Sequence, residues 1–303
     1  MNVLEVTDVR KHLGKREIIK GISFNVQEGE IFGFLGPNGA GKTTTIRMLV
    51  GLISPNNGSI KIMDYDLHKD REKALSYLGA VVENPELYGY LSGRENLMQI
   101  ARIRGISKVE VDNIIKLIGL EDRINDKFKK YSLGMKQRLG LGAALLCNPK
   151  LLILDEPTNG LDPSGILDFR EIVKTAAKER GMAVFVSSHI LSEVQQLCDR
   201  VAFINHGEIQ SIENINETTT LNEKETLALI THKNDLATSI IKDLDYVYDY
   251  KLEDDKLSVI IKSGFTPSLI NNLVRHDIAI EEIYKKHKGL EQRYMELVEG
   301  GVR

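Results

Sequence analysis

Hydrophobic and polar residues alternate in some parts of this chain and form unbroken apolar runs in others. They alternate at Val3–Val9 and Ile18–Val26, as in half-buried strands, and an apolar run at Ile31–Leu35 predicts a third strand. Lys150–Leu154 and Met182–Val186 are mainly apolar without alternation, which suits strands buried on both faces. Because helical stretches separate these strands, the pattern predicts an α/β fold with a mostly parallel sheet.

The middle of the chain, at about residues 84–140, is predicted to be a helical insert. Ser92-Gly93-Arg94-Glu95 has the spacing of a capping box and predicts a helix to about Arg104. A second helix is expected at Val109–Ile118, and a third opens at Ser132-Leu133-Gly134. We place these helices within a first domain at residues 1–212.

The composition changes near Asn214–Glu225, where Asn, Thr and Glu predict a linker at residues 213–225. Residues 226–303 then show the order β-α-β-β-α-β and a terminal helix at Gly289–Val298, which predicts a small α+β domain of ferredoxin-like topology. No chemical constellation is found there, so we interpret it as an accessory domain for regulation or docking.

A glycine-rich stretch lies directly between the predicted strand Ile31–Leu35 and a helical run that begins at Thr45. It fits the phosphate-loop spacing G-x-x-x-x-G-K-[ST] and comprises Gly36, Pro37, Asn38, Gly39, Ala40, Gly41, Lys42, Thr43 and Thr44. Glycines let backbone N–H groups approach phosphate oxygens, and the following helix adds its positive dipole end. In this motif Lys42 reaches the β- and γ-phosphates, and the Thr43 hydroxyl holds Mg²⁺. The alternative, a turn that binds nothing, is disfavoured by the two correct flanks.

Polar residues also follow the two unbroken apolar strands. Asp155 and Glu156 come after the first of these strands, and His189 comes shortly after the second. Because ligands of parallel sheets bind beyond the carboxyl ends of the strands, these side chains are expected beside the phosphate loop. Asp155 is a candidate Mg²⁺ ligand, Glu156 a candidate base for the attacking water, and His189 a candidate γ-phosphate contact. A carboxylate pair that only caps a strand, and a structural histidine, are the plainer alternatives.

Composition narrows the class of protein. Hydrophobic residues make up 42% and charged residues 27%, as in ordinary globular proteins. The net charge of −3 offers no electrostatic basis for nucleic-acid binding, so no nucleic-acid partner is expected. Cys147 and Cys198 lie in apolar neighbourhoods and are expected to be reduced core thiols. The longest apolar stretch, Leu139–Cys147, is too short for a bilayer, and Met1–Glu5 lacks a signal pattern, so any membrane role would be peripheral.

Taken together, the motifs resemble those of ATP-binding cassette (ABC) proteins over roughly residues 1–212. The phosphate loop matches the Walker A motif, Leu151–Glu156 resembles Walker B with its catalytic glutamate, and Asn159–Asp162 resembles the D-loop. His189 is similar to the switch histidine, and Tyr131–Met135 to the signature L-S-G-G-Q that separates cassettes from other phosphate-loop proteins.

The resemblance implies a phosphate-loop NTPase that binds and hydrolyses ATP with Mg²⁺. It also implies a head-to-tail dimer, in which Ser132 and Gly134 of one copy close on the nucleotide of the other. The signature departs from the family pattern at Leu133 and Met135. Leu13 stands where an adenine-stacking aromatic residue is expected, with His12 beside it as an alternative contact.

Glu83 stands in place of the Q-loop glutamine, and the resemblance makes it a further candidate Mg²⁺ ligand. Together with the short insert and the C-terminal domain, Glu83 resembles the bacitracin-type export subfamily. That subfamily implies an ATPase subunit on the cytoplasmic face of the cell membrane, driving a separate integral membrane permease, often for antimicrobial peptides. Coupling would pass through Glu83–Tyr90, and we expect a partly exposed apolar patch at Leu87, Tyr88, Tyr90 and Leu91.

Two other functions are alternatives to a transporter ATPase. A soluble cassette protein of translation or DNA repair would usually carry two cassettes with a basic linker, or long coiled coils, and neither is predicted here. A non-catalytic ATP sensor with a degenerate site is opposed by Lys42, Asp155, Glu156 and His189, which are all in place.

Overall fold

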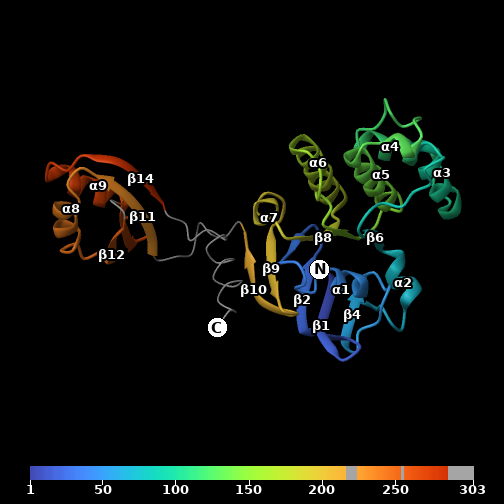
Figure 1. Ribbon diagram of the computed structural model, residues 1–303, viewed down its shortest axis with the longest axis horizontal. Helices are drawn as coiled ribbons and strands as arrows, with labels where there is room; N and C mark the ends of the chain where they lie inside the picture. The colour runs from blue at the N-terminus through green and yellow to red at the C-terminus, as the bar shows by residue number, and fades with distance from the viewer. Residues whose placement is uncertain (216–223, 254–255, 286–303) are drawn as a thin grey trace. The chain divides into compact units, whose positions relative to one another are not determined.

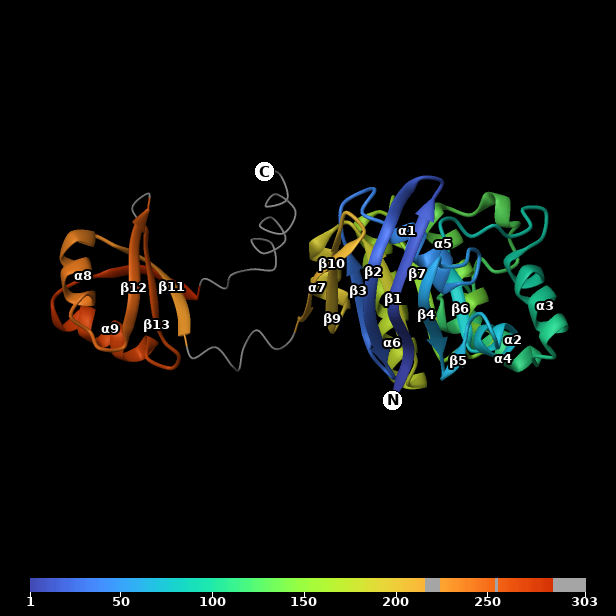
Figure 2. The same ribbon diagram turned by 90° about the horizontal axis from the view of Figure 1, so that it is seen from below.

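The computed structural model describes residues 1–215, 224–253 and 256–285 of the chain. Two compact units, Met1–Ile215 and Asn216–Arg303, make up the chain and are drawn in Figures 1 and 2. The domain end expected at residue 212 falls inside β10 (Glu208–Asn214), which belongs to the first unit. The helix expected at Gly289–Val298 lies outside the described residues.

A six-stranded, mostly parallel sheet forms the centre of the first unit (Figure 1). Its strand order is β10-β9-β3-β8-β7-β6, and β10 alone among these strands runs antiparallel to its neighbour. The other strands are β3 (Ile31–Leu35), β6 (Leu78–Val81), β7 (Leu151–Asp155), β8 (Ala183–Ser188) and β9 (Arg200–Asn205). Every residue of β3, β7 and β8 is buried. The prediction of a mostly parallel sheet with unbroken apolar strands is confirmed.

A second, antiparallel sheet with the order β2-β1-β4-β5 shares a hydrophobic core with the first. Its strands are β1 (Asn2–Leu13), β2 (Arg16–Gln27), β4 (Asn57–Ile62) and β5 (Tyr65–Asp66). Phe24 of β2 stacks on Phe32 of β3 with ring centroids 5.5 Å apart. The alternating pattern predicted β1 and β2 as strands, but the grouping of these strands with β4 and β5 into a separate sheet was not predicted.

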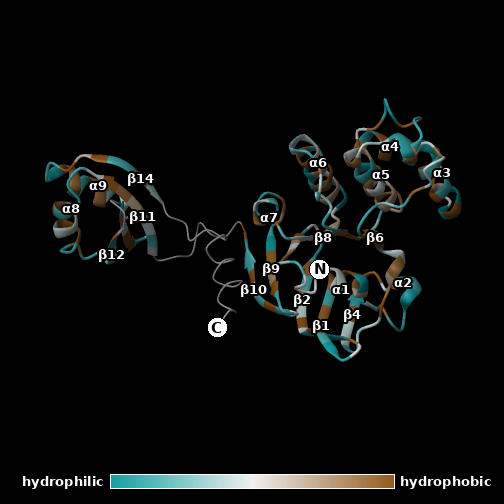
Figure 3. Ribbon diagram, viewed as in Figure 1, coloured by the Kyte–Doolittle hydropathy of each residue, from teal (hydrophilic) through white to brown (hydrophobic). Residues whose placement is uncertain are grey.

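The helices of the first unit fall into two sets. One set is connected to the strands around this core, and the other forms the helical insert. α1 (Lys42–Leu49), α2 (Arg71–Ser76), α6 (Pro163–Arg180) and α7 (Leu191–Leu197) are connected to the strands. The helical insert consists of α3 (Gly93–Arg104), α4 (Lys108–Leu117), a short 3₁₀ turn η1 (Phe128–Lys130) and α5 (Leu133–Leu145), with mixed hydrophobic and hydrophilic positions (Figure 3).

Two sequence predictions for the insert have clear outcomes. The capping box is present, because Ser92 Oγ accepts from Glu95 N–H and Ser92 N–H donates to the Glu95 carboxylate. The insert is longer than expected, since α5 continues to Leu145, beyond residue 140. The strands β5 and β10 and the helix α2 were not predicted. β5 and α2 offer too few positions for a periodic pattern. β10 has only two apolar residues, Ile209 and Ile212, and their separation of three positions does not give the alternation of a strand.

The second unit has the ferredoxin-like topology that the sequence predicted. Its sheet has the order β12-β13-β11-β14, and all three neighbouring pairs are antiparallel. The elements are β11 (Lys224–Thr231), α8 (Asn234–Ile241), β12 (Val247–Glu253), β13 (Lys256–Lys262), α9 (Thr266–Arg275) and β14 (Ile280–Lys285).

The two cysteines differ in exposure. Cys198 is buried, and this burial raises the pKa of its thiol. Cys147 is exposed, so the prediction of two core thiols is wrong for this residue. The reason is that α5 ends at Leu145 and Cys147 lies in the turn that follows it.

Among the described residues, no helix combines the length and the apolar character that crossing a membrane requires.

Candidate functional site

The phosphate loop leaves the carboxyl end of β3 and enters α1. Gly41 caps this helix with φ 112°, a conformation that favours glycine, and no side chain of the cap residue accepts from the first N–H groups of the helix. The first N–H groups of α1 and its positive dipole end are therefore available to an anion. At Gly36, a Cβ would lie 2.2 Å from the carbonyl oxygen of Ile204, so a larger residue would displace the loop.

Lys42 is held over this loop by three oxygen atoms. The side chain is only 6% exposed, and its Nζ donates to the carbonyl oxygens of Gly36 at 2.7 Å and Pro37 at 3.2 Å. The same Nζ lies 3.2 Å from Glu156 Oε1. The ammonium group is thus fixed where the loop would receive phosphate oxygens.

Glu156 joins the lysine to the histidine. Its Oε2 atom lies 2.6 Å from His189 Nδ1, while Oε1 faces Lys42. Glu156 directly follows β7, His189 directly follows β8, and Lys42 is the first residue of α1. The structure therefore places Lys42, Glu156 and His189 in direct contact, at the strand ends where the sequence predicted them.

The backbone at Glu156 is strained, with φ at +45°. Such a conformation costs a residue other than glycine roughly 1–3 kcal/mol and persists only where neighbours enforce it. Ser187 is one such neighbour: its Oγ accepts from Glu156 N–H at 3.0 Å and donates to Asp155 Oδ1 at 2.7 Å. The function of Ser187 was not predicted, although its position opposite Asp155 in the β7–β8 pairing places its hydroxyl at the site.

Asp155 is the most buried acidic group of the site, at 3% exposure. Burial raises its pKa, the Ser187 hydrogen bond lowers it, the charges of Glu156 and Glu83 raise it, and Lys42 lowers it. The net effect is a raised pKa, so the ionised carboxylate is destabilised in the folded protein. A bound cation would stabilise it.

The residues present fit Mg²⁺. Asp155 and the Thr43 hydroxyl are hard oxygen donors, and Mg²⁺ in nucleotide sites takes few protein ligands, with phosphate and water filling the rest. In the described part of the chain, no group of three or more His, Cys, Asp or Glu residues could hold a metal ion. The donor set thus suits a cation that arrives with the nucleotide.

The Asp155→Asn variant is expected to be more stable than wild type near pH 7 without nucleotide. The pKa of Asp155 is raised in the folded state, so its ionisation costs stability as the pH rises above the unfolded-state value of about 4. Asn removes this cost and retains an oxygen that accepts from Ser187. Thermal melts from pH 4 to 8 should show a higher Tm at pH 7 and a smaller difference near pH 4.

Addition of MgATP should reverse that order, because the variant lacks the carboxylate assigned to Mg²⁺. A nucleotide-free Asp155→Asn protein that melts below wild type at pH 7 contradicts the predicted cost of this buried charge.

Glu83 lies outside the cluster of Lys42, Glu156 and His189. Its side chain is 59% exposed and pairs with Arg47 Nη2 at 2.7 Å. Its φ of +60° is unusual for a residue that is not glycine. Its charge still reaches Asp155, whose pKa it helps to raise.

The signature residues lie at the start of α5, in the helical insert. Ser132 caps α5, with its Oγ accepting from Met135 N–H at 3.3 Å, so the hydroxyl proton is available to another acceptor. A Cβ at Gly134 would meet Leu161 at 3.8 Å, which is ordinary van der Waals contact, so the backbone here is not tightly enclosed. Among the described residues, no hydrogen bond or ion pair joins Ser132 or Gly134 to the phosphate loop of the same chain.

Leu13 and His12 lie at the turn between β1 and β2. Leu13 is 52% exposed, and His12 Nε2 lies 3.9 Å from Glu17 Oε1. The contact of either residue with adenine stays a prediction.

A phosphate loop between a buried strand and a helix, with a carboxylate pair at a nearby strand end, defines a phosphate-loop NTPase. The family model described as "ABC transporter" matches residues 19–159. The chain is 45% identical to the uncharacterized ABC transporter ATP-binding protein YhcH of Bacillus subtilis (strain 168), over 97% of this chain and 95% of that protein.

Two further comparisons agree. The bacitracin transport ATP-binding protein BcrA of Bacillus licheniformis is 38% identical, over 99% of this chain and 98% of that protein. A solved ATP binding subunit of an ABC transporter superposes with a TM-score of 0.65 at 30% identity, covering 71% of this chain and 91% of that one. The chain therefore belongs to the ABC transporter family, as an ATP-binding and ATP-hydrolysing subunit, and the translation or repair alternative is not favoured.

Proposed function

We propose that this chain is the ATPase subunit of an exporter for antimicrobial peptides or similar compounds. It would act at the cytoplasmic face of the cell membrane, bound to a separate integral membrane permease, and would contribute to antibiotic resistance. The similarity to BcrA carries this proposal, because it spans 99% of this chain and so includes the second unit as well as the cassette.

The catalytic roles follow from the contacts of the site. Lys42 binds the β- and γ-phosphates, and Glu156 accepts a proton from the attacking water while His189 Nδ1 orients its carboxylate. In the structure Lys42 Nζ faces Glu156 Oε1 at 3.2 Å. A γ-phosphate competes for this ammonium group, which leaves Oε1 free to accept the proton.

Thr43 and Asp155 would hold Mg²⁺, which when bound neutralises charge on the phosphates. The other half of each site comes from a second copy of the chain, whose Ser132 hydroxyl and Gly134 N–H face the γ-phosphate across a homodimer interface. The available proton of the Ser132 hydroxyl supports this arrangement.

The permease would dock beside the segment that follows β6. A groove of about 680 Å³ lies there. Its lining residues include Val82, Glu83 and Leu87 of the segment after β6, Ile100 of α3 and Ala143 of α5. Directly after Leu87, Tyr88 and Tyr90 are 57% and 68% exposed, with ring centroids 5.8 Å apart. Leu87 and Leu91 are partly buried. The groove has both charged and apolar lining residues. Exposed tyrosines, which have an apolar ring and a polar hydroxyl, suit a cytoplasmic segment of the permease with mixed apolar and polar side chains.

Replacing Tyr88 and Tyr90 together by Ser is expected to release the protein from membranes that contain its permease. The test co-expresses the chain with a candidate permease and measures the membrane-bound fraction and peptide resistance. Both should fall, while ATP hydrolysis by the isolated subunit stays unchanged.

Tyr248→Ser, at a tyrosine 48% exposed in the second unit, serves as the matched control. Full membrane recovery of the double variant argues against this docking surface. Equal recovery and resistance with and without the permease argues against the transporter function itself.

A further inference from the structure

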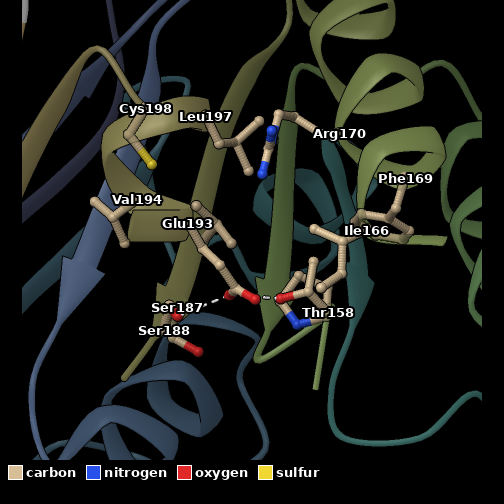
Figure 4. Close-up of a pocket in the computed structure, with 12 residues that line it drawn as sticks. Thr158, Ile166, Phe169, Arg170, Ser187, Ser188, Glu193, Val194, Leu197 and Cys198 are labelled. Carbon is tan, nitrogen blue, oxygen red and sulfur yellow. Dashed lines mark hydrogen bonds between the residues drawn. The ribbon is translucent and has the colours of Figure 1, made fainter. Parts of the chain in front are cut away.

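One carboxylate outside the predicted site joins the two turns that carry Glu156 and His189. Glu193 of α7 accepts two hydrogen bonds at the same atom, Oε2, from Thr158 Oγ1 at 2.6 Å and from Ser188 Oγ at 3.1 Å (Figure 4). Thr158 lies two residues after Glu156, and Ser188 directly precedes His189. Glu193 thus bridges the turn after β7 and the turn after β8.

Along the chain, this bridge holds a residue after Glu156, whereas Ser187 holds Asp155 before it and the N–H of Glu156 itself. Ser187 holds the backbone N–H of Glu156 and the carboxylate of Asp155 at the strand ends. Glu193 holds the chain two residues further on, so Glu156 is restrained from both sides. A residue with φ at +45° needs such restraint, because relaxation of φ would turn its carboxylate away from His189.

Water cannot readily replace the bridge. Thr158 is 9% exposed and Ser188 is 4% exposed. The cavity beside them has about 20 Å³ of space and is closed largely by apolar side chains such as Ile166, Val194 and Leu197 (Figure 4). This volume holds one water molecule at most. A Thr158 hydroxyl without Glu193 would stay poorly satisfied, so the turn would shift to find another partner.

We propose that Glu193 is a positioning residue for ATP hydrolysis, which acts through Thr158 and Ser188 to keep Glu156 against His189. The inference rests on the proposed role of Glu156 as the base. Glu193 has no contact with the nucleotide in this scheme, so its loss affects turnover and leaves ATP affinity intact.

The test compares Thr158→Val, Thr158→Ser and Glu193→Gln in the full chain. Thr158→Val keeps the shape of the side chain and removes the donor, so kcat for ATP hydrolysis should fall about tenfold, the effect of one lost hydrogen bond, with KM within about twofold. Thr158→Ser restores the hydroxyl and should recover kcat to within about threefold of wild type. Glu193→Gln keeps one accepting oxygen but loses the charge, and should give an intermediate kcat.

Gln196→Ala, at an exposed position of the same helix, is the matched control and should leave kcat unchanged. Wild-type kcat in both Thr158→Val and Glu193→Gln overturns the proposal. A parallel fall of kcat and Tm that Thr158→Ser does not rescue also overturns it, because Glu193 then serves folding alone.

Glu156→Gln, assayed alongside, separates this inference from the function on which it rests. If Glu156→Gln blocks hydrolysis and Thr158→Val does not, the positioning role alone fails. If Glu156→Gln hydrolyses ATP at the wild-type rate, the assignment of the base fails, and the positioning role fails with it.

Discussion

The Glu156→Gln variant is expected to bind MgATP like wild type and to lose at least about 100-fold in kcat, the usual scale of general base catalysis. Glutamine has the shape of glutamate, but its amide does not accept the proton of the attacking water. The substitution also removes the charge that pairs with Lys42 at 3.2 Å, so Lys42 stays available to the phosphates. ATP affinity should therefore be retained while turnover stops.

Two measurements check this expectation. Steady-state release of phosphate gives kcat, and size-exclusion chromatography with MgATP should show an ATP-bound dimer that accumulates because hydrolysis no longer resolves it. Glu171→Gln, at an exposed position of α6, is the matched control. Wild-type turnover in Glu156→Gln would mean that the contact with His189 is structural and that another group serves as the base.

The Lys42→Ala variant should show the opposite pattern, with the loss in binding. Removal of a charge-assisted contact to phosphate costs about 1.5–3 kcal/mol, which raises the Kd for ATP roughly 10- to 150-fold. Lys42 is only 6% exposed and already aimed at the loop by Gly36 and Pro37, so little ordering is needed on binding. Because the side chain is already ordered, the loss of its contact with phosphate should appear in full as a higher Kd for ATP.

Calorimetric titration with ATP measures the change, and the Tm without nucleotide separates binding from folding. Lys61→Ala, at an exposed lysine of β4, is the control. An unchanged Kd for ATP in a folded Lys42→Ala protein would refute the assignment of Lys42 to the phosphates.

The strand β3 and the loop after it show which features can be predicted from the local sequence. Ile31–Leu35 is found at the predicted bounds, because a run of buried side chains between turn residues leaves few other conformations. Gly36–Thr44 follows from spacing, since Gly41 must adopt φ 112° where the loop enters α1. The order of elements in the second unit was likewise predicted, because short alternating strands and well-marked helix starts are local features.

Contacts between distant residues were decided only by the tertiary structure. Glu156 meets His189, 33 positions later, because β7 and β8 are neighbours in the parallel sheet. Glu83 pairs with Arg47 across 36 positions, and Glu193 accepts from Thr158 across 35 positions. The periodicity of hydrophobic residues does not predict which residues so far apart in the sequence will touch.

By itself, the sequence determined the α/β class, the phosphate loop and the residues available for catalysis, since these depend on neighbouring side chains and fixed spacing. The tertiary structure decided which of those residues touch, that β1, β2 and β4 form a separate sheet, and that Cys147 faces solvent. The physical reason is that strand order and layer packing bring remote segments together, and the free energy of that packing belongs to the whole fold rather than to any one stretch.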